Sequence, residues 1–157
     1  MPTEDPNPYG NYYFKLELDG LEVGHFVECS GLKAQTEVYE IQEGGINGFT
    51  HKRPSGFKWD NLVLRFATSA STHLATWIEH WLTGEYGDSV RRDGSVTLMN
   101  NNGEDVKSWH FRRGWPVSWE GPQLSASGSE LAVESIEIAH EGIEIATSGR
   151  TATTGRV

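Results

Sequence analysis

The sequence predicts a mainly β protein of one domain with a single α-helix. Its 157 residues include 18 glycines and only two methionines, and 36% of them are hydrophobic, which is typical of a turn-rich β protein. Several short segments alternate apolar and polar residues, and turn signals rich in glycine and asparagine separate them. A chain of this length buries roughly two thirds of the surface that it exposes when unfolded, so one hydrophobic core is expected.

The first third of the chain is predicted to form three strands. Residues 12–18 alternate between apolar and polar side chains, and the turn signal Asp19-Gly20 leads back into a second strand at residues 23–29. These two strands form a β-hairpin. Residues 36–42 alternate in the same way and predict a third strand.

A glycine-rich segment at residues 44–56 is predicted to be a long loop. Loops of about a dozen residues are uncommon in compact domains and usually have a function. Its glycines permit positive φ angles, and Ile46 and Phe49 are apolar side chains that are costly to leave in water. We interpret the segment as an assembly loop that buries both side chains against another chain. The alternative is a flexible hairpin loop folded back on its own domain.

One helix is predicted after a fourth strand at residues 62–66. Ser71 or Thr72 is its N-terminal cap, and it ends before Gly84. Its apolar residues recur every three or four positions and form one stripe, which consists of Leu74, Trp77, Ile78, Trp81 and Leu82. We expect this stripe to seal the open end or side of a small β-barrel. A cofactor site is the alternative, but it needs polar groups that converge on the stripe.

The second half of the chain predicts another hairpin and further strands. Residues 95–100 and 106–112 flank the turn Asn101-Asn102-Gly103, whose residues accept the left-handed backbone of a tight turn. A strand at residues 115–120 follows. Residues 131–145 predict one or two strands, with a bulge where the apolar phase shifts between Val133 and Ile136.

The folded domain is expected to span residues 11–146. Residues 1–10 contain three prolines and predict an extended arm, and residues 147–157 are small and polar and predict a mobile tail. The N-terminus lacks the features of a secretion signal, and no run of 18 apolar residues occurs. Assembly in the cytoplasm is therefore expected, with release only as part of a particle or by lysis.

The charge and the motifs argue against nucleic-acid binding and against catalysis. There are 22 acidic and 13 basic residues, giving a net charge of -9, and the basic pairs are short and separated. The common motifs for catalysis and for nucleotide binding are missing, so no catalytic residue and no cofactor is predicted. His73 and His80 lie about 10 Å apart along the helix axis. That separation is too large for one metal ion, and no metal site is predicted.

The single cysteine, Cys29, excludes an internal disulfide. Ser30 follows it and His25 precedes it by four residues, but strand geometry does not bring these groups together as a nucleophile and its base. We expect Cys29 to be a small buried residue at the corner before Gly31.

Three motifs in order carry a resemblance to a known family. Residues 26–32 read Phe-Val-Glu-Cys-Ser-Gly-Leu, residues 40–47 read Glu-Ile-Gln-Glu-Gly-Gly-Ile-Asn, and residues 109–122 contain the pattern Trp-x-Phe-x-x-x-Trp-Pro-x-x-Trp-x-Gly-Pro. This order resembles the tail tube proteins of contractile phage tails and of related contractile injection systems. The resemblance covers nearly all of residues 11–145 and extends to the haemolysin-coregulated protein of type VI secretion.

The resemblance implies a small β-barrel of two packed antiparallel sheets with a flanking helix, assembling as hexameric rings that stack into a hollow tube. Residues 42–54 would then contact a neighbouring ring, through an interface that comprises Glu43, Gly44, Gly45, Ile46, Asn47, Phe49, Lys52 and Arg53. The implied partners are other copies of the chain, a sheath protein, a baseplate tube initiator, a tube terminator or cap, and luminal cargo or a tape measure. The acidic balance suggests a negative lumen, and no stable nucleic-acid or membrane binding by the subunit itself is expected.

Two other functions remain open on the sequence. A baseplate tube initiator shares the fold but usually carries extra segments. A monomeric binding module could line a ligand groove with Trp109, Trp115 and Trp119, which alternation places on one strand face. The same pattern serves the core between two sheets, and large aromatic residues dominate cores, so a core position is favoured. An enzyme is the weakest alternative.

Overall fold

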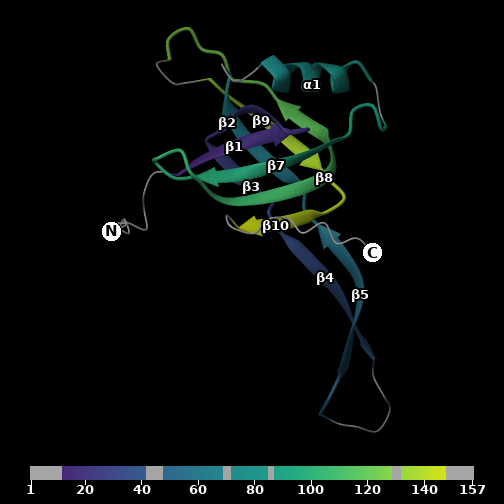
Figure 1. Ribbon diagram of the computed structural model, residues 1–157. Helices are drawn as coiled ribbons and strands as arrows, with labels where there is room; N and C mark the ends of the chain where they lie inside the picture. Colours follow the sequence, from purple (N-terminus) through teal and green to yellow (C-terminus); the bar gives the residue numbers. More distant parts are fainter. Residues whose placement is uncertain (1–11, 42–47, 69–71, 85–86, 129–131, 148–157) are drawn as a thin grey trace, which may run out of the picture.

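The computed structural model describes residues 12–41, 48–68, 72–84, 87–128 and 132–147. Within these residues the chain has a β-rich body, a helix over one end of it and a long hairpin that projects from the opposite end (Figure 1). In chain order the elements are β1 (Tyr13–Leu18), β2 (Leu21–Phe26), β3 (Glu28–Ser30), β4 (Ala34–Ile41), β5 (His51–Trp59), β6 (Leu62–Ala67), α1 (Thr72–Leu82), β7 (Arg92–Met99), β8 (Asp105–Glu120), β9 (Val133–Ala139) and β10 (Ile143–Thr147). The predicted mainly β fold with one helix is confirmed.

Two antiparallel sheets make up the body and share strand β8. The first sheet has the order β2-β1-β7-β8, with β10 on the far side of β8, and the second has the order β8-β9-β6-β3. The chain also passes between the sheets from β2 to β3, where the Val27 N–H donates to the Arg65 carbonyl (2.9 Å). The strand order runs from β2 to β3 without pairing these two strands, so the body is two packed sheets and not a fully hydrogen-bonded barrel.

Strand β8 bends where it passes from one sheet to the other. Arg113 has a φ of 49°, which is uncommon for a residue other than glycine, and its N–H donates to the Asp93 carboxylate (2.8 Å). β10 pairs with β8 before this bend and β9 pairs with it afterwards, so the two run along one side of β8 as an interrupted strand. At the interruption the Glu141 N–H donates to the Arg112 carbonyl (2.9 Å), and the Arg112 N–H donates to the Gly142 carbonyl (3.1 Å).

The predicted bulge between Val133 and Ile136 is wrong, because β9 pairs with β6 in continuous register. The chain is interrupted instead at residues 140–142, which separate β9 from β10. The irregular register lies in β8, between Pro116 and Ser118. The separately predicted strands at 106–112 and 115–120 also form one strand, because the bend at Arg113 does not end the pairing.

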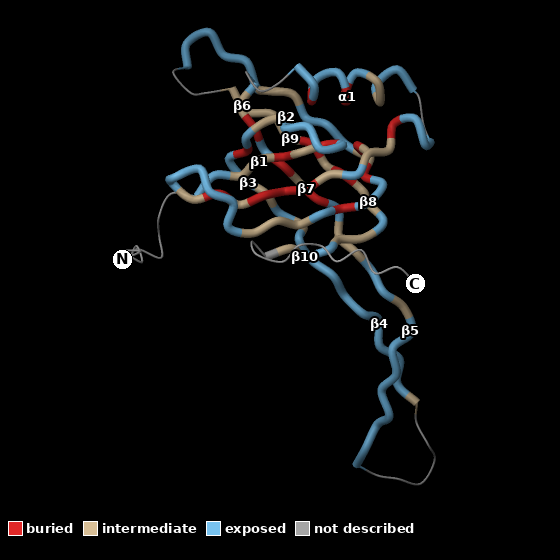
Figure 2. Tube along the Cα trace, viewed as in Figure 1, coloured by how far each residue is buried: buried red, intermediate tan, exposed pale blue. Residues whose placement is uncertain are grey.

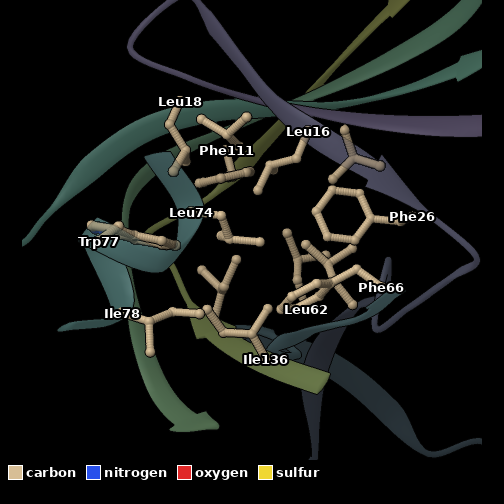
Figure 3. Close-up of a cluster of buried hydrophobic side chains, with 14 of the residues drawn as sticks. Leu16, Leu18, Phe26, Leu62, Phe66, Leu74, Trp77, Ile78, Phe111 and Ile136 are labelled. Atoms are coloured by element: carbon tan, nitrogen blue, oxygen red, sulfur yellow. The ribbon is translucent and has the colours of Figure 1, made fainter. Parts of the chain in front are cut away.

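The core lies between the two sheets and beneath the helix (Figures 2 and 3). Both sheets contribute fully buried side chains, which include Leu16, Val96 and Phe111 from the first and Leu62, Leu64, Ile136 and Ile138 from the second. Complete burial of one such side chain stabilises a protein by about 1.5–3 kcal/mol. The fold therefore rests on these alternating positions of its strands.

Helix α1 closes the end of this core, as predicted. Leu74, Trp77 and Ile78 are buried, and the Trp77 indole N–H donates to the Val90 carbonyl (2.8 Å). The predicted stripe is wrong at its C-terminal end, because 54% of Leu82 is exposed. Gly84, with a φ of 85°, follows the helix in the left-handed conformation that ends helices.

The tryptophans of β8 do not all share one strand face, contrary to the prediction. Trp119 pairs with Ile136 and Trp115 pairs with Ala139, and positions three apart on β9 point to opposite faces. The register shift between these two tryptophans produces the change of face. They therefore do not form a common aromatic groove, and Trp119 remains 38% exposed instead of entering the core.

Candidate functional site

The feature of the molecule that stands apart from the core is the β4–β5 hairpin. These two strands pair with each other as a separate two-stranded sheet, which extends away from the body (Figures 1 and 2). With eight residues in β4, the hairpin is about 25 Å long at a rise of roughly 3.3 Å per residue. A two-stranded hairpin is marginally stable by itself in water, so this one is suited to being supported by a partner.

The prediction of a loop over residues 44–56 is therefore wrong from His51 onwards, because β5 begins there. Pro54 and Gly56 argue against a strand when only the sequence is considered, because both residues are rare in the interior of a sheet. They are tolerated here because both strands of an isolated ribbon are edges. The pairing register shifts between Glu37 and Val38, whose Cα partners are Gly56 and Pro54. Ser55 is therefore the extra residue of a bulge in β5.

Apolar side chains are exposed at several positions of the described part of the hairpin. Val38 and Phe57 lie on one face, with 56% and 62% of their surface exposed, and Tyr39 lies on the other. Phe49, which precedes β5, is 83% exposed. Exposed apolar side chains gathered on one projection are characteristic of a protein interaction surface.

The predicted interface residues fall partly on this hairpin. Phe49, Lys52 and Arg53 are described and exposed, and the Cα partners of the two basic residues are Glu40 and Tyr39. The other predicted residues, Glu43, Gly44, Gly45, Ile46 and Asn47, lie outside the described residues. Val38, Tyr39 and Phe57 were not predicted as interface residues. The alternation of residues 36–42 indicates a strand, but it does not reveal that both faces of this strand are exposed.

The root of the hairpin is held by a close contact between its two ends. Gly31 has a φ of 88°, and a Cβ atom placed there would lie only 1.9 Å from the Asn61 carbonyl oxygen. The Asp60 N–H donates to the Lys33 carbonyl (3.0 Å) beside this contact. The chain entering the hairpin and the chain leaving it are therefore fixed together by backbone contacts that require glycine.

His140 connects the same root to the interruption between β9 and β10. The Gly142 N–H donates to its Nδ1 (3.2 Å), so Nε2 carries the ring hydrogen and donates to the Asp60 carbonyl (2.9 Å). Burial lowers the pKa of His140, and the hydrogen bond to Asp60 opposes this shift. A proton on Nδ1 removes the acceptor for Gly142, so these contacts require the neutral ring.

Aromatic contacts continue from His140 in both directions. Its ring centroid lies 5.9 Å from that of Trp59, whose own neighbour Phe57 is at 5.2 Å, and 6.5 Å from that of the core residue Phe111. The first two contacts are edge-to-face and the contact with Phe111 is tilted; an edge-to-face aromatic pair adds about 0.5–1.5 kcal/mol beyond its buried area. The orientation of the hairpin is thus coupled to the core.

We expect acid to weaken the root through His140. Because its pKa is lower in the folded chain than the ordinary 6.5, the unfolded chain binds the proton first, and stability falls as the pH drops below 6.5. The variant His140→Gln is expected to show a shallower decrease of Tm with acidification, measured by circular dichroism. The exposed His25→Gln is the control. Equal slopes for wild type and His140→Gln would contradict this role.

The reactive side chains at Cys29 and His25 are not arranged as a nucleophile and its base. Burial raises the pKa of the Cys29 thiol to about 11, and its Cα partner is the core residue Leu64. The His25 ring pairs instead with Glu22 (2.9 Å). In the part of the chain that the structure describes, no three His, Cys, Asp or Glu side chains are grouped for a metal ion, and no helix is long and apolar enough to cross a membrane.

Comparison with known proteins connects this architecture to one family. The family model described as T4-like virus tail tube protein gp19 matches residues 10–144. The chain belongs to this tail tube family. No curated protein sequence matches the chain.

Solved structures share the fold of this tail tube protein. A chain of the anti-feeding prophage baseplate is 18% identical, with a TM-score of 0.75, and covers 92% of this chain and 98% of its own. A chain of the sheath-tube complex of the extracellular contractile injection system PVC is 22% identical, with a TM-score of 0.74 and coverage of 92% and 94%. Hcp1 from Flavobacterium johnsoniae is 17% identical, with a TM-score of 0.58 and coverage of 86% and 95%. The resemblance expected from the sequence is confirmed, and the protein is a structural subunit of an inner tube.

Proposed function

We propose that this tail tube protein assembles into hexameric rings, and that the rings stack into a hollow tube through the β4–β5 hairpin. The observation that carries the proposal is the hairpin itself, which leaves the body with exposed apolar residues along it. A partner that covers these residues removes their apolar surface from water, and each Å² that is buried stabilises the assembly by roughly 25 cal/mol. The inter-ring contact includes the predicted residues at 43–47 together with Phe49, Lys52 and Arg53.

Lateral contacts within a ring would use the edges of the first sheet. β2 and β10 lie at its two sides, and each pairs with one strand of the described chain. Unpaired edges expose backbone donors and acceptors that favour pairing with another strand. Pairing between neighbouring copies around a closed ring satisfies both edges at once.

The tube would serve a contractile particle of the phage or phage-like type. A sheath around the tube, a baseplate initiator at one end and a terminator or cap at the other are the proposed partners. The neighbours come from a baseplate, from a sheath-tube complex and from a structure described as a tube terminating cap, the last 25% identical with a TM-score of 0.73. Sheath contraction would drive the tube through a target envelope with its cargo. The subunit has no catalytic role in this process and requires no cofactor.

Residues 11–146 form the assembling domain in this proposal, with residues 1–10 and 147–157 as appendages to it. Assembly takes place in the cytoplasm, and the completed particle leaves the cell by lysis.

Electron microscopy of the purified chain over a concentration series tests the proposal, with light scattering to measure mass. Six-fold rings and stacked tubes are expected for the wild type. Phe49→Ser is expected to leave rings but shorten the stacks, because it removes an exposed apolar anchor from the hairpin. Gln35→Ser, nearer the root of the same hairpin, is the control. Stacks of wild-type length in Phe49→Ser would contradict the assigned contact.

A further inference from the structure

Helix α1 lies at the end of the body opposite the hairpin (Figure 1), and a second apolar surface is found beside this helix. Helix α1 and the strands beside it enclose a hollow of about 230 Å³, whose floor is formed by Phe66, Leu74 and Ile78. Leu82 and Trp119, which are partly exposed, lie at the same hollow. The helix stripe and β8 therefore leave apolar surface that the subunit does not cover.

The size of this hollow indicates a side chain as its occupant. Pockets for small molecules usually measure roughly 300–1,000 Å³. The hollow is below that range, while one aromatic side chain of a partner fits within it. A protein segment with a projecting aromatic residue is thus better suited than a free ligand.

The two glutamates at the hollow are opposite in charge to Lys52 and Arg53, the basic residues near the far end of the hairpin, although β4 also carries Glu37 and Glu40. Glu79 and Glu134 lie at the hollow and form no ion pair within the described residues. On the hairpin, Lys52 and Arg53 are exposed and likewise form no ion pair with described residues. They lie within four residues of Phe49, the most exposed large apolar side chain of the described chain.

We propose that the hollow at α1 receives the hairpin of a second copy of this chain. Phe49 of that copy enters the apolar hollow, with Lys52 and Arg53 beside Glu79 and Glu134. This assignment rests on the proposed stacking function and adds the surface that receives the hairpin.

The positions of the two surfaces determine the kind of assembly. The hairpin and the hollow are different surfaces at opposite ends of one molecule, so their contact is heterologous. Each copy that donates its hairpin at one end still presents a free hollow at the other. Heterologous contacts either close into a ring or repeat along an axis, and surfaces at opposite ends of the subunit favour repetition along an axis, which is the geometry of a stack and not of a two-fold dimer.

A charge exchange between the two surfaces tests the pairing. The first variant carries Lys52→Glu and Arg53→Glu, the second carries Glu79→Lys and Glu134→Lys, and the third carries all four changes. We expect each double variant to raise the concentration needed for stacking by about tenfold or more, because like charges then face each other. The fourfold variant should restore stacking. Glu104→Lys, at the β7–β8 turn, is the control, and melting curves verify that every variant folds.

Cross-linking reports the same contact without requiring long tubes. A mixture of Phe49→Cys and Leu82→Cys chains should form a disulfide dimer that contains one copy of each. Neither chain alone should form it, and Glu104→Cys should not replace Leu82→Cys. The half-buried native Cys29, whose thiol is poorly ionised, should react little with either.

The outcomes separate this inference from the function on which it depends. Loss of stacking in the first variant alone, or loss in both without rescue by the fourfold variant, overturns the hollow as the receiving surface and leaves the hairpin as the ring contact. Normal stacking in the first variant, together with no mixed dimer, contradicts the proposed role of the hairpin in stacking, while absence of stacks in the wild type contradicts the stacking function itself.

Discussion

Shortening the β4–β5 hairpin is expected to abolish tube formation and leave the subunit folded. The change replaces residues 38–55 with Asn-Gly, which joins Glu37 to its Cα partner Gly56 through a two-residue turn. The described part of the removed segment is exposed, except for the half-buried Ile41. Its loss should therefore change the free energy of unfolding by about 0.5 kcal/mol or less. Electron microscopy and thermal melting of the same preparation measure both effects.

The expected result separates assembly from folding. Rings or monomers with a wild-type melting transition should remain, because the core, the helix and the root contacts are untouched. Gln35→Ala retains the full hairpin and is expected to form tubes as the wild type does. Tubes of normal length in the shortened variant would mean that the rings contact each other through another part of the subunit.

Gly31→Ala is expected to destabilise the fold by about 3 kcal/mol or more. A left-handed backbone costs a residue other than glycine about 1–2 kcal/mol, and overpacking adds about 1–3 kcal/mol. Both costs apply here, because φ is 88° and the new Cβ atom would lie 1.9 Å from the Asn61 carbonyl oxygen. The contact is with backbone, so no side chain can move to relieve it. Denaturant unfolding of wild type and variant measures the difference.

Gly20→Ala is the matched control for this substitution. Gly20 has a similar φ of 79°, but nothing lies within 4 Å of the position of its Cβ atom. It should show the backbone cost alone and retain tube formation. Equal destabilisation by the two substitutions would show that the close approach at the hairpin root contributes nothing.

The two predictions concern different parts of the β4–β5 hairpin. Gly31, Asp60 and His140 hold the root of the hairpin against the body, while the exposed residues farther along make the proposed contact with a partner. In the proposed stack, the root of the hairpin sets the position of the contact residues relative to the body. Weakening the root is therefore expected to affect tubes at conditions in which the body is still folded.

Much of the architecture could be predicted from local patterns. The turn at Asp19-Gly20, the turn at residues 101–103 and the helix that begins at Thr72 were predicted within a few residues of their observed positions. Each depends on neighbouring residues alone: glycine and asparagine in left-handed turns, and apolar spacing in the helix. The order of three motifs also predicted the tail tube family, which the comparison confirms.

The errors occurred where distant residues decide the conformation. β5 was missed because Pro54 and Gly56 are acceptable only in a ribbon with two free edges, and no local pattern reveals that the ribbon is isolated. The faces of Trp115 and Trp119 were misassigned because a register shift in β8 lies between them. Register depends on the partner strand, so alternation along one strand cannot determine it.

The sequence by itself determined the mainly β class, the single helix, the absence of an internal disulfide and the family, because these depend on composition, on short-range periodicity and on the order of motifs. The tertiary structure decided that residues 51–56 of the glycine-rich segment belong to a projecting hairpin, that Gly31 and His140 hold its root, and that an apolar hollow with two glutamates beside it lies at the opposite end. The physical reason is that hydrogen-bond register, close backbone approach and the arrangement of exposed surfaces arise only when residues distant in the chain come together.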